Sequence, residues 1–308
     1  MSALLLRAPQ TDRPSHATLR KIVVTDLDRA DTYPTLSDTT VRVMALATKV
    51  DVSVAEVAGL VRRDGVLAAG VLRAANSCAI RGGKAIDDVQ PAILRMGLQE
   101  CCRLLSTMGV KNVYNRCSPA VQERCDAILR HSLFVARLAS GISKDAGVGQ
   151  TGTAFTAGLL HDIGRLVACV KCPDDATAAA LLTADETEDT LRLEREYLGT
   201  DHCAVGHQFA TRNKLPESVA HAILNHHRPA DEALHRELVA LVAVAERMAA
   251  HVQRKHNIVG YNLVACPHFP VLAHGWTAAR AAAFHKALPG TVVQAMRDTR
   301  TMLKSCTS

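Results

Sequence analysis

The segment from Phe155 to Ala168 constrains the fold of this chain more than any other stretch. Its apolar residues surround nearly the whole helical circumference, and a helix of that kind belongs inside a domain. The middle of the segment nevertheless carries an imidazole beside a carboxylate, His161 and Asp162. Ionisable side chains are rarely buried without a partner, because desolvating a charge costs several kcal/mol. The sequence therefore predicts a buried helix whose polar pair is satisfied by other groups in the interior.

The composition is that of an ordinary globular protein. The chain has 308 residues, of which 48% are hydrophobic and 21% charged, enough for one large domain or two small ones. Aromatic residues make up only 3%, so we expect an aliphatic, alanine-rich core of the kind that close-packed helices form. The net charge is +6, but lysine and arginine are scattered. Without a basic block or interleaved aromatic residues, the pattern does not indicate nucleic-acid binding.

The apolar segments and the cysteines indicate the compartment. No stretch reaches the roughly 18 uninterrupted apolar residues of a membrane span, and the run at Leu4–Leu6 is too short for a signal peptide. The ten cysteines lack the framework of a small disulfide-rich domain and are typical of reduced thiols. Cys169 and Cys172 form a C-x-x-C motif without a second pair, which favours packing over a zinc site. These features predict a cytoplasmic protein without membrane association.

Helical periodicity runs through most of the chain, and no segment shows the alternation of a β-strand. The sequence Ser53-Val54-Ala55-Glu56 is a capping box, and Pro119 is typical of a first helical turn. A polar stretch at 111–118 separates several short helices from a second group of longer ones. We expect an all-α fold, with individual helices over 155–168, 217–227 and 232–252 and two closing helices over 277–287 and 291–303, separated at Pro289-Gly290.

Polar residues recur on the apolar faces of the second group of helices. They are His131, His161, Asp162, His202, His226, His227 and Glu246. A single histidine of this kind is more often hydrogen-bonded to backbone in a core than bound to a ligand. Seven such groups on five helices can satisfy one another by sharing a divalent cation. Imidazole with carboxylate suits Mn, Fe or Zn better than Mg or Ca, so the pattern predicts a site for one or two ions of the former kind.

The order of these seven residues resembles the ligand order of the HD superfamily of metal-dependent phosphohydrolases. The first half of the chain, which contains YPTLSDTTVRVMALATKVDVSVAEVAGLVRRDGVLAAGVLRAANS and AILRMGL, resembles the N-terminal half of the HDOD family, the HD-related output domains of bacterial signalling. The second half of this chain resembles the second half of the same family. The segments that carry this resemblance, in the same order, are RHSLFVARLA, TAGLLHDIGRLV, EREYLGTDHCAVGHQFATRNKLPESVAHAILNHHRP and LVAVAERMA. The resemblance covers roughly residues 30–252.

The resemblance implies a single all-helical domain in two lobes. We expect an N-terminal tail over 1–29, an HDOD domain over 30–252 and a C-terminal helical extension over 253–308. Within the domain, a helical lobe spans 30–112 and an HD-like lobe with the metal-binding residues spans 113–252.

The resemblance also implies a function in bacterial signal transduction. HDOD domains are generally regarded as signalling modules, so we expect a regulatory protein that acts mainly through a protein partner in a signalling pathway. The alternative is an active metal-dependent phosphohydrolase that cleaves a nucleotide or another phosphoester. The sequence departs from the HD pattern at Glu246, where aspartate is usual, and at Arg165, where lysine is common. The Gly-Tyr-Pro signature of the cyclic-di-GMP phosphodiesterase relatives is missing after Pro229.

The two functions assign different roles to the same residues. In a catalytic centre Asp162 would bind or bridge the metals, the histidines would complete the ligand set, and Arg165 would neutralise developing phosphate charge. In a regulatory protein these residues would form a hydrogen-bonded or single-metal core beneath a protein-binding surface. A glutamate at 246 places its carboxylate about 1.5 Å further out than an aspartate would. We therefore expect Glu246 near the centre but poorly placed as a ligand, with little or no phosphodiesterase turnover.

Overall fold

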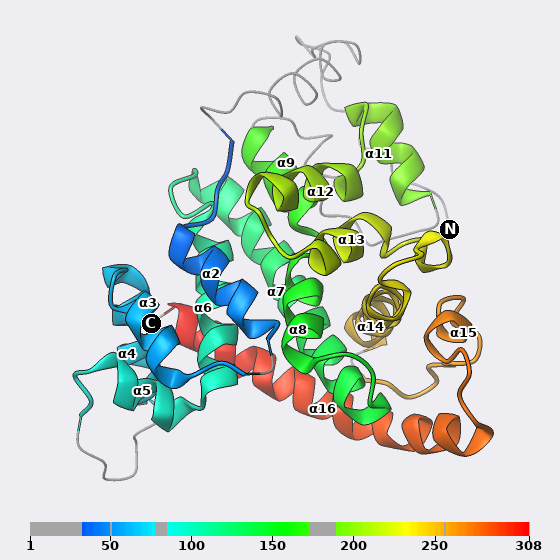
Figure 1. The fold of residues 1–308 in the computed structure, drawn as a ribbon. Coiled ribbons are helices and arrows are strands. Elements are labelled where there is room, and N and C mark those ends of the chain that lie inside the picture. The colour runs from blue at the N-terminus through cyan, green and yellow to red at the C-terminus, as the bar shows by residue number, and fades with distance from the viewer. Residues whose placement is uncertain (1–32, 50, 78–84, 173–188, 256, 308) are drawn as a thin grey trace.

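The computed structural model describes residues 33–49, 51–77, 85–172, 189–255 and 257–307. Within these ranges the regular secondary structure is helical and contains no strand (Figure 1). The predicted all-α fold class is therefore confirmed. The predicted N-terminal tail lies outside the described residues.

Five short helices form the first lobe. They are α2 (Asp38–Ala47), α3 (Val54–Val61), α4 (Gly65–Ser77), α5 (Val89–Met96) and α6 (Leu98–Asn112). At the start of α3 the Ser53 hydroxyl accepts the Glu56 backbone N–H at 3.1 Å, which is the N-cap half of the predicted capping box. Gly97, at φ 85°, permits the sharp turn between α5 and α6. Fully buried aliphatic residues such as Leu105 join this lobe to the core of the second lobe.

The second lobe is built around one long helix. It consists of α7 (Pro119–Ala146), α8 (Thr151–Leu160), α9 (Ile163–Lys171), α11 (Thr190–Leu198), α12 (His202–Arg212), α13 (Glu217–Asn225), the short η2 (Pro229–Asp231) and α14 (Arg236–Lys255). Helix α7 packs against α8, α9 and α14. The stretch Thr151–Lys171 has the length and apolar composition of a membrane span, but 89% of its most apolar window is buried within the protein. This stretch is therefore a core segment of the folded domain.

The buried helix expected over 155–168 is interrupted at its polar pair. α8 ends at Leu160 and α9 begins at Ile163, with Asp162 between them at φ −100° and ψ 15°. Glycines on the two sides of the interruption allow close backbone contacts with other helices. A Cβ atom at Gly158 would lie 2.7 Å from the backbone of Ala136 in α7, and one at Gly164 would lie 1.9 Å from the His202 carbonyl oxygen of α12. The prediction of one continuous helix was wrong. The two halves pack against different partners: α8 lies mainly along α7, whereas α9 lies mainly along α12.

The start of α14 also differs from the prediction. The helix begins at Arg236 rather than at residue 232. The Glu232 carboxylate accepts the backbone N–H groups of Leu234 and His235 at 2.8 and 3.1 Å, so it shapes the turn that precedes the helix.

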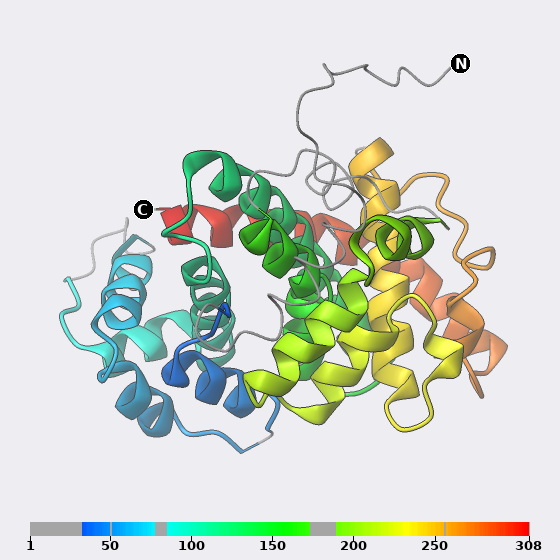
Figure 2. The same ribbon diagram turned by 90° about the horizontal axis from the view of Figure 1, so that it is seen from above.

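The C-terminal segment contains the four-residue α15 (Phe269–Leu272) and a single long helix, α16 (Ala278–Thr307), instead of two closing helices. Pro289 lies inside α16, where it removes one backbone hydrogen bond at a cost of about 3 kcal/mol. Buried residues on both sides of it, Phe284, Leu288 and Val292, keep one apolar stripe continuous. This packing along α7 outweighs the effect of the proline. α16 also contacts α4 and α6, so it extends across both lobes (Figure 2).

Candidate metal centre

Several elements of the second lobe deliver polar side chains to one buried point. His131 comes from α7, His161 and Asp162 from the turn between α8 and α9, His202 from the start of α12, His226 and His227 from the residues after α13, and Glu246 from the middle of α14. Centroids of neighbouring imidazole rings lie between 4.3 and 5.6 Å apart. We call these seven residues, together with Cys203, the candidate metal centre. His226 and His227 follow α13 rather than belong to it, so the expected helix over 217–227 ends early, at Asn225.

Most side chains of the centre are buried. Five of the seven residues chosen from the sequence are buried: His161, Asp162, His202, His226 and Glu246. The other two, His131 and His227, are partly exposed. So many ionisable groups persist in an interior only where charges and hydrogen-bonding atoms find partners.

One part of the centre places two histidines against a glutamate. Glu246 Oε2 lies 2.8 Å from Nε2 of His131 and 3.0 Å from Nε2 of His161. Nδ1 of His161 lies 2.8 Å from the Gly158 carbonyl oxygen, and it donates to that oxygen because a carbonyl can only accept. His161 Nε2 also lies 3.6 Å from Asp162 Oδ2. In the neutral ring, His161 Nε2 is an acceptor that faces the Glu246 carboxylate, which also only accepts. A proton or a metal ion is therefore needed between Nε2 of His161 and Oε2 of Glu246.

The neighbouring carboxylates raise the pKa values of both imidazoles in this part. Burial opposes that charge, but the charge and hydrogen bond of Glu246 raise the pKa of His131 to about 10. The pKa of His161 is also raised, against burial, by Asp162 and Glu246. Conversely, burial disfavours the Asp162 carboxylate, yet Arg165 and His161 hold its pKa well below the usual range. A divalent cation can replace such protons, since metal ligands bind in their deprotonated forms.

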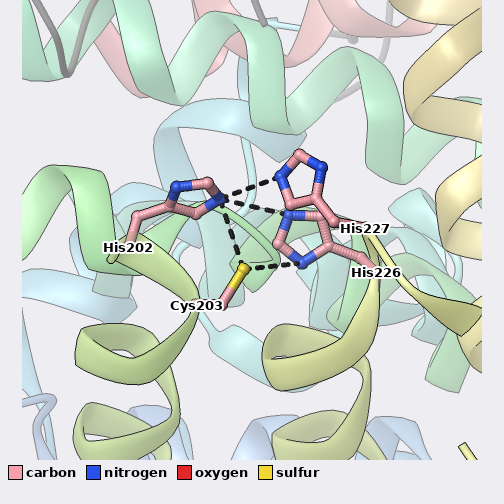
Figure 3. Close-up of side chains that lie close together, drawn as sticks. All are labelled: His202, Cys203, His226 and His227. Atoms are coloured by element: carbon pink, nitrogen blue, oxygen red, sulfur yellow. Dashed lines mark hydrogen bonds between the residues drawn. The ribbon is translucent and has the colours of Figure 1, made fainter. Parts of the chain in front are cut away.

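The second part of the centre gathers nitrogen lone pairs. Nδ1 of His202 donates to Glu194 Oε2 at 2.7 Å, and Nδ1 of His226 donates to the Ile223 carbonyl at 2.9 Å. With the proton on Nδ1, Nε2 is the acceptor nitrogen of each ring, and these two nitrogens face each other at 3.3 Å (Figure 3). His227 Nε2 lies 3.2 Å from His202 Nε2. Burial, with the charge of His227 next, lowers the pKa of His226 well below its usual range, which keeps this ring neutral.

Asp162 and Cys203 complete this second part. Asp162 Oδ1 lies 3.4 Å from Nε2 of His202 and 4.0 Å from Nε2 of His226, and it has no hydrogen-bond partner among the described residues. The Cys203 thiol lies 3.5 Å from His202 Nε2 (Figure 3). Ligands around a tetrahedral ion are about 3.4 Å apart when the metal–nitrogen distance is about 2.1 Å. The donor types and their spacing therefore fit one divalent ion here.

Arg165 lies behind these ligands. It is 4% exposed, and its Nε lies 3.4 Å from Asp162 Oδ1 while Nη2 lies 4.0 Å from Glu194 Oε1. In this position the guanidinium compensates the charges of two buried carboxylates.

Sequence reasoning missed three contributing residues: Glu194, Cys203 and Gln253. Glu194 is completely buried although its helix is largely polar, and it accepts both the backbone N–H and Nδ1–H of His202. Nothing in the sequence pattern marks it. Cys203 directly follows His202 in the sequence, so its position next to a predicted site residue could have identified it. Gln253 lies 3.0 Å from His131 and stands two helical turns after Glu246, a spacing that a search of that helical face could have found.

The comparisons with known proteins agree on the fold. Residues 33–229 match the family model for the HDOD domain. An uncharacterized protein from Treponema pallidum (strain Nichols) is 24% identical over 226 residues, which cover 73% of this chain and only 44% of that protein. This chain therefore spans less than half the length of its curated relative.

Solved structures extend the comparison to nearly the whole chain. An HDOD domain protein of unknown function from Geobacter sulfurreducens has a TM-score of 0.67 and 24% identity, covering 91% of this chain and 97% of that one. A protein from Shewanella amazonensis, provisionally named a phosphohydrolase, has a TM-score of 0.64 and 22% identity, with coverage of 92% and 98%. A protein from Marinobacter aquaeolei, provisionally named for signal transduction, has a TM-score of 0.67 and 18% identity, with coverage of 95% and 66%. At these identities the structures share a fold, and with the family match over more than half its length the chain belongs to the HDOD domain family.

Proposed function

We propose that this protein is a regulatory HDOD protein of bacterial signal transduction, which binds a divalent metal ion at the candidate metal centre and acts through a protein partner. The observation that supports metal binding is the group of acceptors formed by Nε2 of His202, Nε2 of His226 and Oδ1 of Asp162. They lie 3.3 to 4.0 Å apart, and the tautomers of both histidines are fixed by acceptors on Nδ1. A cation satisfies all three atoms at once.

The chemistry of the ligands indicates which metals fit. Imidazole, carboxylate and a thiol suit Zn, Fe or Mn, and we propose one of these metals. When bound, such an ion can lower the pKa of a coordinated water and polarise a phosphoester. Glu194 and the Ile223 carbonyl hold two of the imidazoles in the orientation that binding needs.

The position of Glu246 favours regulation over catalysis. Its Oε2 lies within 3.0 Å of Nε2 in both His131 and His161, in the space that an ion shared by these two rings would need. Two-metal hydrolases use a pair of ions about 3.5 to 4 Å apart to stabilise both the attacking and the leaving oxygen. With Glu246 in this place we propose a single occupied position, on the side of His202, and little turnover. Retention of all the histidines favours the competing function, a metal-dependent phosphohydrolase acting on a nucleotide or another phosphoester.

Metal analysis and a phosphodiesterase assay test these proposals together. The protein is purified with added Mn, Fe or Zn, its metal content is measured by mass spectrometry, and cyclic nucleotides and bis(p-nitrophenyl) phosphate are offered as substrates. We expect one ion per chain and little turnover, with activity rising in Glu246→Asp. Protein that retains no metal would refute the metal centre. Robust turnover of the unmodified protein, abolished in Asp162→Asn, would establish the hydrolase function instead.

We also propose the boundaries 30–252 for the HDOD domain and 253–308 for a C-terminal extension, together with a cytoplasmic location. The packing of α16 along α7 supports an extension that folds with the domain. Every cysteine in the described part of the chain is a free thiol, which suits a reducing compartment. Limited proteolysis tests the boundaries: a stable fragment ending near residue 252 would contradict an extension that is packed into the fold.

A further inference from the structure

Cys203 brings a thiol to the candidate metal centre, although it is not among the seven residues that the sequence pattern supplied. It stands directly after His202 in the first turn of α12, and it is 3% exposed. Its Sγ lies 3.5 Å from Nε2 of His202 and 4.0 Å from Nδ1 of His226 (Figure 3). The sulfur therefore faces the histidine nitrogens of the second part of the centre.

Four donor atoms surround Nε2 of His202 at nearly equal distances. They are Nε2 of His227 at 3.2 Å, Nε2 of His226 at 3.3 Å, Oδ1 of Asp162 at 3.4 Å and Sγ of Cys203 at 3.5 Å. With zinc–nitrogen distances of about 2.1 Å and a zinc–sulfur distance of about 2.3 Å, tetrahedral ligands lie about 3.4 Å apart for two nitrogens and about 3.6 Å apart for nitrogen and sulfur. The distances from His202 match those of an ion that it shares with the other donors.

A thiol hydrogen bond alone does not account for this arrangement. The Cys203 S–H group is a weak donor with a single proton, which His202 Nε2 can accept. Asp162 Oδ1 is buried without a hydrogen-bond partner among the described residues, and it lies 4.0 Å from Nε2 of His226. A divalent cation satisfies the carboxylate and the ring nitrogens together, and the thiol releases its proton to solvent when the sulfur binds the ion.

The number of donors determines whether a bound ion keeps a position for water. Structural zinc sites have four protein ligands, whereas catalytic sites have three and hold water or substrate at the fourth position. Here His202, Cys203, His226 and His227 already provide four donors, and Asp162 provides a fifth. Protein atoms can therefore occupy every position of a tetrahedral ion, while hydrolysis by a metal-bound water requires an open one.

The thiol also narrows the choice of metal. Thiolate is a soft ligand that selects zinc, whereas carboxylate and water suit manganese. A set of imidazoles with one thiolate, four-coordinate and buried, is the chemistry of a structural zinc site.

We propose that Cys203 is a ligand of the bound ion, that this ion is zinc, and that protein atoms alone fill its coordination sphere. The zinc then holds the start of α12 to the residues that follow α13, and it is closed to water and to phosphoesters. This inference rests on the proposed binding of an ion on the side of His202. It gives a reason for low turnover that does not depend on Glu246.

Cobalt(II) substitution of the full chain tests the proposal, because both a thiolate ligand and an open position change the absorption spectrum of cobalt. Metal is removed with EDTA, the chelator is removed by gel filtration, and CoCl₂ is titrated in the absence of oxygen. Sodium azide is then added as a small anion that coordinates open positions, and ZnCl₂ competes for the site. Cys203→Ser removes the thiolate at nearly constant size, and Cys172→Ser, in the C-x-x-C motif outside the centre, is the matched control.

We expect one cobalt ion per chain, with a thiolate-to-cobalt charge-transfer band in the near ultraviolet. The band should be present in the wild type and in Cys172→Ser and absent from Cys203→Ser. Azide should leave the wild-type spectrum unchanged. The Kd for zinc should rise at least about tenfold in Cys203→Ser and stay within about twofold in Cys172→Ser.

The outcomes separate this inference from the proposed function. Bound cobalt without the band, or with a band that persists in Cys203→Ser, overturns the inference and leaves the metal centre in place. A wild-type spectrum that shifts with azide overturns the closed sphere, and protein that takes up no metal refutes the metal centre itself. If Cys203→Ser does not fold, X-ray absorption at the zinc edge of the wild type decides. One sulfur at about 2.3 Å supports Cys203, whereas no sulfur, or the two sulfurs of the C-x-x-C motif, overturns it.

Discussion

Replacement of Asp162 by asparagine is the perturbation that tests the metal centre most directly. The Asp162 side chain is almost completely buried, and its oxygens lie 3.4 Å from Arg165 Nε, 3.4 Å from His202 Nε2 and 3.6 Å from His161 Nε2. Asparagine has nearly the same size, so the surrounding packing is retained. The variant removes the negative charge that compensates Arg165 and offers a metal ion a much poorer ligand.

The expected magnitude has two components. Removing one partner from a buried ion pair typically costs about 3 to 5 kcal/mol. Arg165 keeps Glu194 at 4.0 Å, so we expect the lower end, about 3 kcal/mol, in metal-free protein. An ion at one hundred times its Kd adds about 2.7 kcal/mol to the unfolding free energy of the wild type and nothing to that of the variant. The difference between the two proteins should therefore grow from about 3 to about 6 kcal/mol when metal is added.

Urea unfolding followed by circular dichroism, with EDTA or with saturating Mn or Zn, measures both components. Asp231→Asn is the matched control, because Asp231 is 63% exposed and pairs with Arg228 only at 3.8 Å. We expect it to change the unfolding free energy by less than about 0.5 kcal/mol under both conditions. If the metal stabilised Asp162→Asn as much as the wild type, the ion would be bound elsewhere and the reasoning would fail.

Three further predictions concern the surroundings of the centre. Gly164→Ala should lower the unfolding free energy by about 3 kcal/mol, because its Cβ would lie 1.9 Å from the His202 carbonyl oxygen; Gly59→Ala, with no atom within 4 Å, should not destabilise, and equal losses in urea unfolding would contradict this packing argument. Burial opposes ionisation of Glu232, but hydrogen bonds from His221 and the backbone lower its pKa from 4.5 to about 2. Since the pKa is lower in the folded state, the carboxylate stabilises the protein above pH 4.5, and this contribution is lost as the pH falls toward 2; Glu232→Gln should lack that loss in urea unfolding between these pH values. Cys203→Ser should weaken Zn binding by about tenfold or more while Mn binding changes less, as measured by chelator competition; unchanged Zn affinity would show that the thiol is not a ligand.

Periodicity predicted the inward-facing residues of regular helices. His131 on α7, His202 on α12 and Glu246 on α14 each share a stripe with aliphatic neighbours, and each lies within the candidate metal centre, His131 against Glu246 and His202 against Asp162. Where a helical face must be buried, side-chain direction follows from sequence spacing alone. Such reasoning finds inward-facing polar residues that are part of a helix, and it also gave the all-α fold.

Contacts between distant segments were not predictable in this way. Glu194 is buried because α11 places it against His202, and no local pattern distinguishes it from the solvated acidic residues around it. Likewise, Pro289 indicates a break in an isolated helix, but packing against α7 keeps α16 continuous. In each case a tertiary contact worth several kcal/mol outweighs a local preference of smaller or similar size.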